Sequence, residues 1–197
     1  MHHDVCNRPR VGRRRSDCAR GRIAATAIPG QTVNPWVFLD FDDVICLNQR
    51  YGGYDVFSPD PPEELWGDLF HRPAVESLRA ITQEFDPRFV VTTSWLRLME
   101  RDGFDRIFRK TGLDFVGGRL NSSWQAPQDR GRTRHAAIKR WLAAHHRGEP
   151  FVVLDDEWSG TGLAGSRMHK HGRVVLCQVG TGLHAGHLDS MRAALRR

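Results

Sequence analysis

The chain has 197 residues, of which 40% are hydrophobic and 26% charged, a composition typical of one folded globular domain and not of a disordered or fibrous chain. No run approaches about 18 consecutive apolar residues, which excludes a membrane-spanning helix. The formal net charge is +6, and four scattered cysteines without a CxxC pair argue against a zinc ribbon or disulfide scaffold, so we expect a cytoplasmic protein.

Residues 1–34 lack a hydrophobic period and are predicted to form a basic N-terminal arm outside the folded domain, which would span residues 35–197. Residues 1–30 contain seven arginines and two aspartates, a net charge of +5, so the rest of the chain carries only +1. Such an arm can bind nucleic acid or an anionic surface, or it can be a leader without a binding role. Its lack of a continuous apolar segment argues against a secretory signal.

After the arm, short apolar runs alternate with segments of helical spacing. The run 36–40 predicts a buried strand, and residues 47–62 predict a loop with room for a small hairpin. Residues 63–84 predict two helices that are separated near Pro73. The apolar run 88–92 predicts a second buried strand.

The second half of the chain continues the alternation. Residues 96–110 predict a helix with a break at Gly103, residues 113–116 a short strand, and residues 119–131 a loop. Residues 134–145 have the apolar spacing of a helix. The last predicted elements are two strands and a helix, at 151–155, 174–177 and 188–195.

Helices that alternate with short, wholly apolar strands are typical of an α/β fold in which both faces of a parallel sheet are covered. We therefore predict a three-layer, Rossmann-like arrangement. Sheets of this kind bind their ligands at the carboxyl ends of the strands, so the residues that follow each apolar run are the candidate site residues.

Clustered polar side chains stand at three of these strand ends. Asp40 and Asp42 follow the first run, Asp155 and Asp156 follow the third, and the hydroxyls of residues 92–94 follow the second. Carboxylates crowded into one crevice repel one another unless a cation holds them. Oxygen ligands without histidine or cysteine nearby favour Mg²⁺ as that cation.

The Asp-x-Asp pair itself suggests phosphoryl chemistry. Residues i and i+2 of an extended chain point the same way, so Asp40 and Asp42 are expected to face one site. One carboxylate can attack phosphorus as a nucleophile, and the other can protonate the leaving oxygen and later deprotonate water. Mg²⁺, a basic side chain, a hydroxyl and backbone N–H groups can then bind the phosphoryl oxygens.

These residues resemble the motifs of the haloacid dehalogenase (HAD) superfamily of phosphohydrolases over residues 35–197. The strand that ends in Asp40-Phe41-Asp42 is similar to the first motif of that family. The strand that ends in Thr92-Thr93-Ser94 is similar to the second, and the strand that ends in Asp155-Asp156 to the fourth. Further strings around Trp95, residues 137–142 and residues 181–183 resemble the small HAD domains associated with bacterial RNA-repair proteins.

The resemblance implies that Asp40 is the nucleophile, which forms an aspartyl-phosphate, and that Asp42 is the general acid and base. It also implies that the Asp40 side chain, the Asp42 backbone carbonyl and Asp155, with Asp156, hold Mg²⁺. Phosphate-binding residues are then Thr92 or Thr93, and a basic residue of the third motif. The implied activity is that of a phosphoric monoester hydrolase.

Two assignments stay open at this stage. The family mostly uses lysine in the third motif, whereas this chain has Arg134 at the corresponding helix start and Lys139 five residues later. A step of five residues turns about 500° around a helix, so the two side chains cannot face the same way, and we favour Arg134. The second-motif hydroxyl is Thr92 if it directly follows the strand, and Thr93 if Trp95 sets the register.

The intervals between the motifs leave 49 residues between Asp42 and Thr92, and 40 between Thr93 and Arg134. Neither suits a large cap domain, so we expect an open site that accepts a bulky phosphorylated substrate. The leading substrate class is a nucleotide or the phosphate at a nucleic-acid end. The alternative is a non-catalytic module that keeps the Mg²⁺ and phosphate pocket. The sequence leaves the oligomeric state open.

Tryptophans and the segment after the third apolar run are further candidates for the site. Trp124 and Trp158 are candidate residues for stacking on bases, whereas the helical spacing of Trp141 predicts a place in the core. Residues 159–162 can either line the site or form a plain turn.

Overall fold

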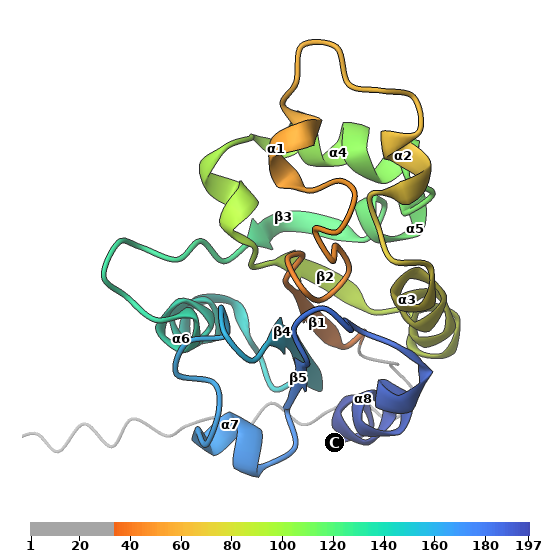
Figure 1. Ribbon diagram of the computed structural model, residues 1–197. Coiled ribbons are helices and arrows are strands. Elements are labelled where there is room, and N and C mark those ends of the chain that lie inside the picture. The colour runs from red at the N-terminus through yellow and green to blue at the C-terminus, as the bar shows by residue number, and fades with distance from the viewer. Residues whose placement is uncertain (1–33) are drawn as a thin grey trace, which may run out of the picture. The chain divides into compact units, whose positions relative to one another are not determined.

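The computed structural model describes residues 34–197, which form a parallel sheet between two layers of helices (Figure 1). The predicted basic arm, residues 1–34, falls outside this range except for Asn34 and therefore stays a prediction. Asn34 already contacts the folded domain, because its side-chain amide donates a hydrogen bond of 2.7 Å to the backbone oxygen of Asp86.

Five strands make up the sheet in the order β3-β2-β1-β4-β5, and every pair is parallel. Their bounds are Trp36–Leu39 (β1), Arg88–Val91 (β2), Leu120–Gln125 (β3), Phe151–Asp156 (β4) and Val174–Cys177 (β5). In the central three strands Leu39 lies opposite both Val91 and Leu154. The residues that follow each of these three positions are therefore brought to the same edge of the sheet.

Helices cover both faces of the sheet, which confirms the predicted three-layer α/β arrangement. On one face, α3 (Arg72–Phe85) and α8 (Leu188–Leu195) pack on the larger core cluster. On the other, α6 (Arg134–His145) packs on a smaller cluster that includes Phe38 and Trp141, as the helical spacing of Trp141 predicted. The remaining helices are α1 (Gly53–Val56), α2 (Leu65–Asp68), α4 (Arg101–Lys110), α5 (Asp114–Gly117) and α7 (Arg167–Lys170), with 3₁₀ turns at Ser94–Arg97 and Ala185–His187.

The sequence prediction was wrong for the edge strand that pairs with β2. The predicted strand at 113–116 is the start of α5, because Leu113 and Val116 are both buried at the three-residue spacing of a helical turn. The fifth strand is instead β3, within the predicted loop 119–131. Its sequence Leu-Asn-Ser-Ser-Trp-Gln has no apolar run, since only Trp124 is buried and the pairing with β2 shifts register.

Two smaller differences concern helices. The predicted helix 96–110 is interrupted before Arg101 and continues through Gly103, so the break lies earlier than predicted. The loop 47–62 contains the single turn of α1 and no hairpin. Among residues 34–197 no large cap domain is inserted, as predicted, and none of the helices combines the length and apolar character needed to cross a membrane.

Glu149 anchors the chain just before β4. Arg88 donates to it from β2 at 3.0 Å, and the backbone N–H of Arg147 donates at 2.6 Å. The guanidinium carbon of Arg88 lies 3.6 Å from the ring centre of Trp36, so the contact also covers the start of β1. Burial raises the pKa of Glu149, but these hydrogen bonds outweigh it and lower the pKa from 4.5 to about 2.

Glu149→Gln should therefore lower the free energy of unfolding by about 1–3 kcal/mol at pH 7, the usual worth of a hydrogen bond to a charged group. Because the folded pKa lies below the unfolded one, this contribution is complete above pH 4.5 and is lost as the pH falls toward about 2. Urea unfolding at several pH values measures it. Glu76→Gln is the control, since its pair with Arg72 is exposed to solvent and is expected to contribute little. Equal stability of Glu149→Gln and wild type at pH 7 would contradict the assignment.

Candidate active site

The alternation of side chains along three strands points the site residues toward α6. Phe38, Val90 and Val153 all belong to the core cluster that α6 covers. Asp40, Thr92 and Asp155 each come two residues later on the same strands and so point to the same side. All three are buried. The register of the sheet therefore places two carboxylates and a hydroxyl side by side below the N-terminus of α6.

Arg134 reaches this cluster from the first position of α6. The side chain of Thr133 caps the helix by accepting a hydrogen bond from the N–H of Ala136. The buried guanidinium of Arg134 lies 3.2 Å from Oδ1 of Asp40 and 3.1 Å from Oδ2 of Asp155. One cation thus bridges the ends of β1 and β4, where the sequence analysis expected the third-motif residue.

A third carboxylate, that of Asp156, completes the cluster. Carboxylate oxygens of Asp40, Asp155 and Asp156 lie within 4.8 Å of one another, and all three residues are buried. The hydroxyl of Ser159 stands where they converge, 3.0 Å from Oδ2 of Asp40, 3.2 Å from Oδ1 of Asp155 and in contact with Asp156. The Ser159 hydroxyl has a single proton, so it can donate a hydrogen bond to only one of these carboxylates at a time.

The cluster contains three carboxyl groups and, among the described residues, one cationic side chain, that of Arg134. Burial raises the pKa of Asp40 to about 6, against the attraction of Arg134 and together with the repulsion of Asp42. Burial also raises the pKa of Asp155, and the charge of Asp40 adds to it. Three buried carboxylates and one guanidinium leave an excess of negative charge. The donor set, made of oxygens alone, is the kind that Mg²⁺ prefers.

Asp42 lies next to this cluster but is held by different partners. Its carboxylate accepts hydrogen bonds from Nε1 of Trp95 at 3.0 Å, from Oγ of Ser94 at 3.1 Å and from Nδ2 of Asn48 at 3.2 Å. The indole ring of Trp95 packs closely against Gly53, where a Cβ would lie only 2.7 Å from the ring. Asp42 is half-buried, so of the two acids in the Asp-x-Asp pair it is the one that solvent can reach.

A cavity of about 400 Å³ opens beside Asp42. Asp42, Asn48 and Trp95 form part of its lining. Its outer part includes Tyr54 and Leu98, whose exposed fractions of 87% and 51% are high for side chains of this kind. An organic group next to Asp42 would therefore meet apolar and aromatic surface.

The structure distinguishes the two threonines and the two basic residues that the sequence left open. The Thr92 hydroxyl is buried and has no hydrogen-bond partner among the described residues, whereas the Thr93 hydroxyl accepts from the N–H of Trp95 and caps the 3₁₀ turn. Arg134 contacts the carboxylates, whereas Lys139 is exposed and lines a different cavity. Arg134 thus lies against the carboxylates and Lys139 does not, and of the two threonines only Thr92 has a hydroxyl that is not used as a cap.

Several neighbours of the site were not assigned by the sequence. Asn48 gave no signal, because polar residues are common in loops, and Ser94 was part of the predicted hydroxyl cluster 92–94 without a role of its own. Residues 159–162 were expected either to line the site or to form a plain turn, and the Ser159 hydroxyl does lie against the carboxylates, 3.2 Å from Oδ1 of Asp155. The prediction that Trp124 stacks on bases was wrong, since it is 8% exposed and packs edge-on against Phe104 at 5.3 Å. Trp158, by contrast, is exposed.

Comparison with known proteins agrees with this geometry. A family model described as the HAD domain in Swiss Army Knife RNA repair proteins matches residues 36–188, well over half of the chain. Neither a search of curated proteins nor a search of solved structures found a match.

Gly160 is required by the loop that closes the carboxylate cluster. A Cβ at this position would lie 2.4 Å from the backbone oxygen of Asp156 and 3.2 Å from Oδ1 of Asp155. We expect Gly160→Ala to destabilise the fold by about 1–3 kcal/mol, the usual cost of overpacking. Gly67→Ala in α2 is the control, because nothing lies within 4 Å of its Cβ and the change should be neutral or stabilising. Urea midpoints measure both, and equal midpoints would refute the packing argument.

Proposed function

Since the chain belongs to the family of HAD domains in Swiss Army Knife RNA repair proteins, we propose that it is a Mg²⁺-dependent phosphohydrolase that removes terminal phosphate groups from RNA. The observation that carries the proposal is the buried contact of Asp40 with Arg134, directly beside the Asp155 and Asp156 carboxylates and the separately held Asp42. A cytoplasmic location is part of the proposal, and the buried free thiols of Cys46 and Cys177 are compatible with it.

Mg²⁺ fits the carboxylate cluster, because three buried carboxylates converge on a single hydroxyl and one guanidinium. Asp40, Asp155 and Asp156 would hold the ion, together with the backbone carbonyl of Asp42. When bound, the ion supplies positive charge that neutralises the phosphoryl oxygens.

In the proposed reaction an Asp40 oxygen attacks the phosphorus atom while the bond from phosphorus to the ester oxygen breaks. Arg134 and the free hydroxyl of Thr92 bind the non-bridging oxygens. Asp42 donates a proton to the leaving ester oxygen and then accepts one from a water molecule. That water attacks the phosphorus of the aspartyl-phosphate, and the bond to Asp40 breaks to release inorganic phosphate.

The cavity beside Asp42 supports a nucleoside as the leaving group. The acid that protonates the ester oxygen must lie on the leaving-group side, and this cavity contains Asp42. Tyr54 offers an aromatic surface there on which a base can stack. No large cap closes the site, so a strand attached to that nucleoside has room to leave.

Asp40→Asn is expected to abolish Mg²⁺-dependent hydrolysis, because the amide is a poor nucleophile. Hydrolysis of 4-nitrophenyl phosphate and of a 5′- or 3′-phosphorylated RNA, each with Mg²⁺ and with EDTA, measures it. The absence of Mg²⁺-dependent hydrolysis by the wild type, with binding of the phosphorylated RNA retained, would instead support a non-catalytic module.

Asp42→Asn should reduce kcat on a phosphorylated RNA end by about 10²–10⁴-fold, the usual contribution of a general acid and base. The reduction should be smaller on 4-nitrophenyl phosphate, whose leaving group needs less protonation. Steady-state kinetics on the two substrates give the ratio. Equal reductions on both would show that Asp42 does not protonate the leaving group.

Arg134→Ala is expected to remove phosphoryl binding and reduce kcat/KM by about 10²-fold or more, and Arg134→Lys to restore part of it, because lysine keeps the charge and loses the fork geometry. Arg140→Ala, an exposed arginine on the same helix, is the matched control and should retain the activity of the wild type. Thermal unfolding of each variant separates a loss of activity from a loss of fold. Wild-type activity in folded Arg134→Ala would refute the role.

A further inference from the structure

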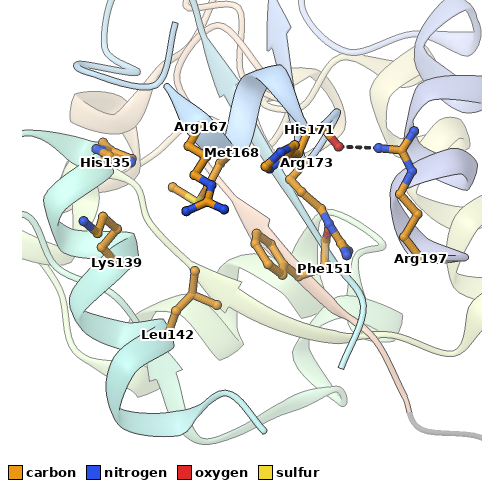
Figure 2. Close-up of a pocket in the computed structure, with 9 residues that line it drawn as sticks. All are labelled: His135, Lys139, Leu142, Phe151, Arg167, Met168, His171, Arg173 and Arg197. Carbon is orange, nitrogen blue, oxygen red and sulfur yellow. Dashed lines mark hydrogen bonds between the residues drawn. The ribbon is translucent and has the colours of Figure 1, made fainter. Parts of the chain in front are cut away.

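A second cavity, of about 700 Å³, lies on the face of the sheet that α6 and α7 cover (Figure 2). Its floor is apolar, from Leu142, Phe151 and Met168. Four cationic side chains surround this floor, from α6, α7, the residue before β5 and the C-terminal residue, and they are Lys139, Arg167, Arg173 and Arg197. We call this the basic groove.

The charge of the basic groove is uncompensated. None of its four cations forms an ion pair within residues 34–197, whereas Arg50 and Arg192 elsewhere on the surface each pair with a carboxylate. No acidic residue is among those that line the groove. Burial and the charge of Arg197 lower the pKa of Arg173, as expected where cations are crowded without a counter-ion.

The upper end of the basic groove begins beside the candidate active site. His135, which lines the groove, directly follows Arg134, and its backbone N–H donates to the oxygen of Thr161 at 3.1 Å. Arg134 contacts Asp40 from the same turn of α6. Arg130 and Arg132, both exposed, lie on the loop that leads into this turn. Two exposed arginines therefore precede the turn of α6 that carries both Arg134 of the site and His135 of the groove.

We infer that the basic groove binds the sugar–phosphate backbone of a single-stranded RNA whose terminal phosphate occupies the active site, an inference that rests on the proposed function. Uncompensated cations provide affinity for phosphodiesters, and the apolar floor provides surface for sugars and bases. Residues 1–33 do not complement the groove, because they carry seven arginines and two aspartates.

The test uses the full chain with Asp40→Asn in every protein, so that the RNA is bound and not hydrolysed. Fluorescence anisotropy at several salt concentrations measures binding of a phosphorylated RNA of about ten nucleotides. Each phosphate contact adds about 0.7 to the slope of log K against log salt for a single strand. Lys139→Ala with Arg167→Ala should therefore lower the slope by about 1.4 and weaken binding roughly tenfold or more near 0.1 M salt.

Two controls make the result specific. Arg79→Ala with Arg109→Ala removes the same charge from α3 and α4, which pack on the other core cluster, and should leave the slope unchanged. A phosphorylated dinucleotide can contact at most the end of the groove at His135, so the groove substitutions should change its affinity much less than that of the longer RNA.

The outcomes separate the two proposals. An unchanged slope for the groove variant, an equal loss in the control variant, or an equal loss for the dinucleotide would each overturn the basic groove as a strand-binding surface. The proposed function fails on a different measurement, namely the absence of Mg²⁺-dependent hydrolysis by the wild type, and the binding data do not depend on it.

Discussion

The candidate site depends on burying more negative charge than the protein itself neutralises. Parallel pairing of β1 with β2 and β4 fixes Asp40 and Asp155 at one edge of the sheet, and the turn after β4 adds Asp156 and the hydroxyl of Ser159. Only Arg134 offers a full positive charge within the cluster. Desolvating charges costs several kcal/mol per ion unless each is well paired, and burial accordingly raises the pKa of both Asp40 and Asp155; a bound cation would lower this cost.

The two acids of the Asp-x-Asp pair lie in different environments, which is compatible with the separate roles proposed for them. Asp40 is buried against a guanidinium, which would keep the proposed nucleophile in one orientation. Asp42 is half-buried and held by neutral donors from Trp95, Ser94 and Asn48. Its half-buried position would let Asp42 reach both the leaving ester oxygen and the attacking water in the proposed reaction. Two acids separated by a single residue would thus acquire separate roles from their surroundings.

The parts of the fold that could be predicted from the sequence are those with a strong local pattern. Strands β1, β2, β4 and β5 are apolar runs, and polar residues of the candidate site follow several of them. Asp40, Asp155 and the helix start at Arg134 could therefore be predicted from the sequence. Strand β3 was missed because it lies at the edge and is polar, with Trp124 as its single buried side chain. Which threonine keeps a free hydroxyl depends on which of the two caps the 3₁₀ turn. The contact of Ser159 with three carboxylates depends on tertiary folding. No local pattern encodes either.

The positions of the leaving-group cavity and the basic groove constrain the form of the substrate. A terminal phosphate has one ester substituent, so the whole strand must leave the site on the side of Asp42 and Tyr54. The groove lies beyond Arg134, on the flank formed by α6 and α7. In the proposed function, a strand that occupied both would have to change direction between the cavity at Asp42 and the flank of α6. A flexible unpaired RNA end can do so more readily than a stiff duplex, so the proposal favours an unpaired RNA end as the substrate.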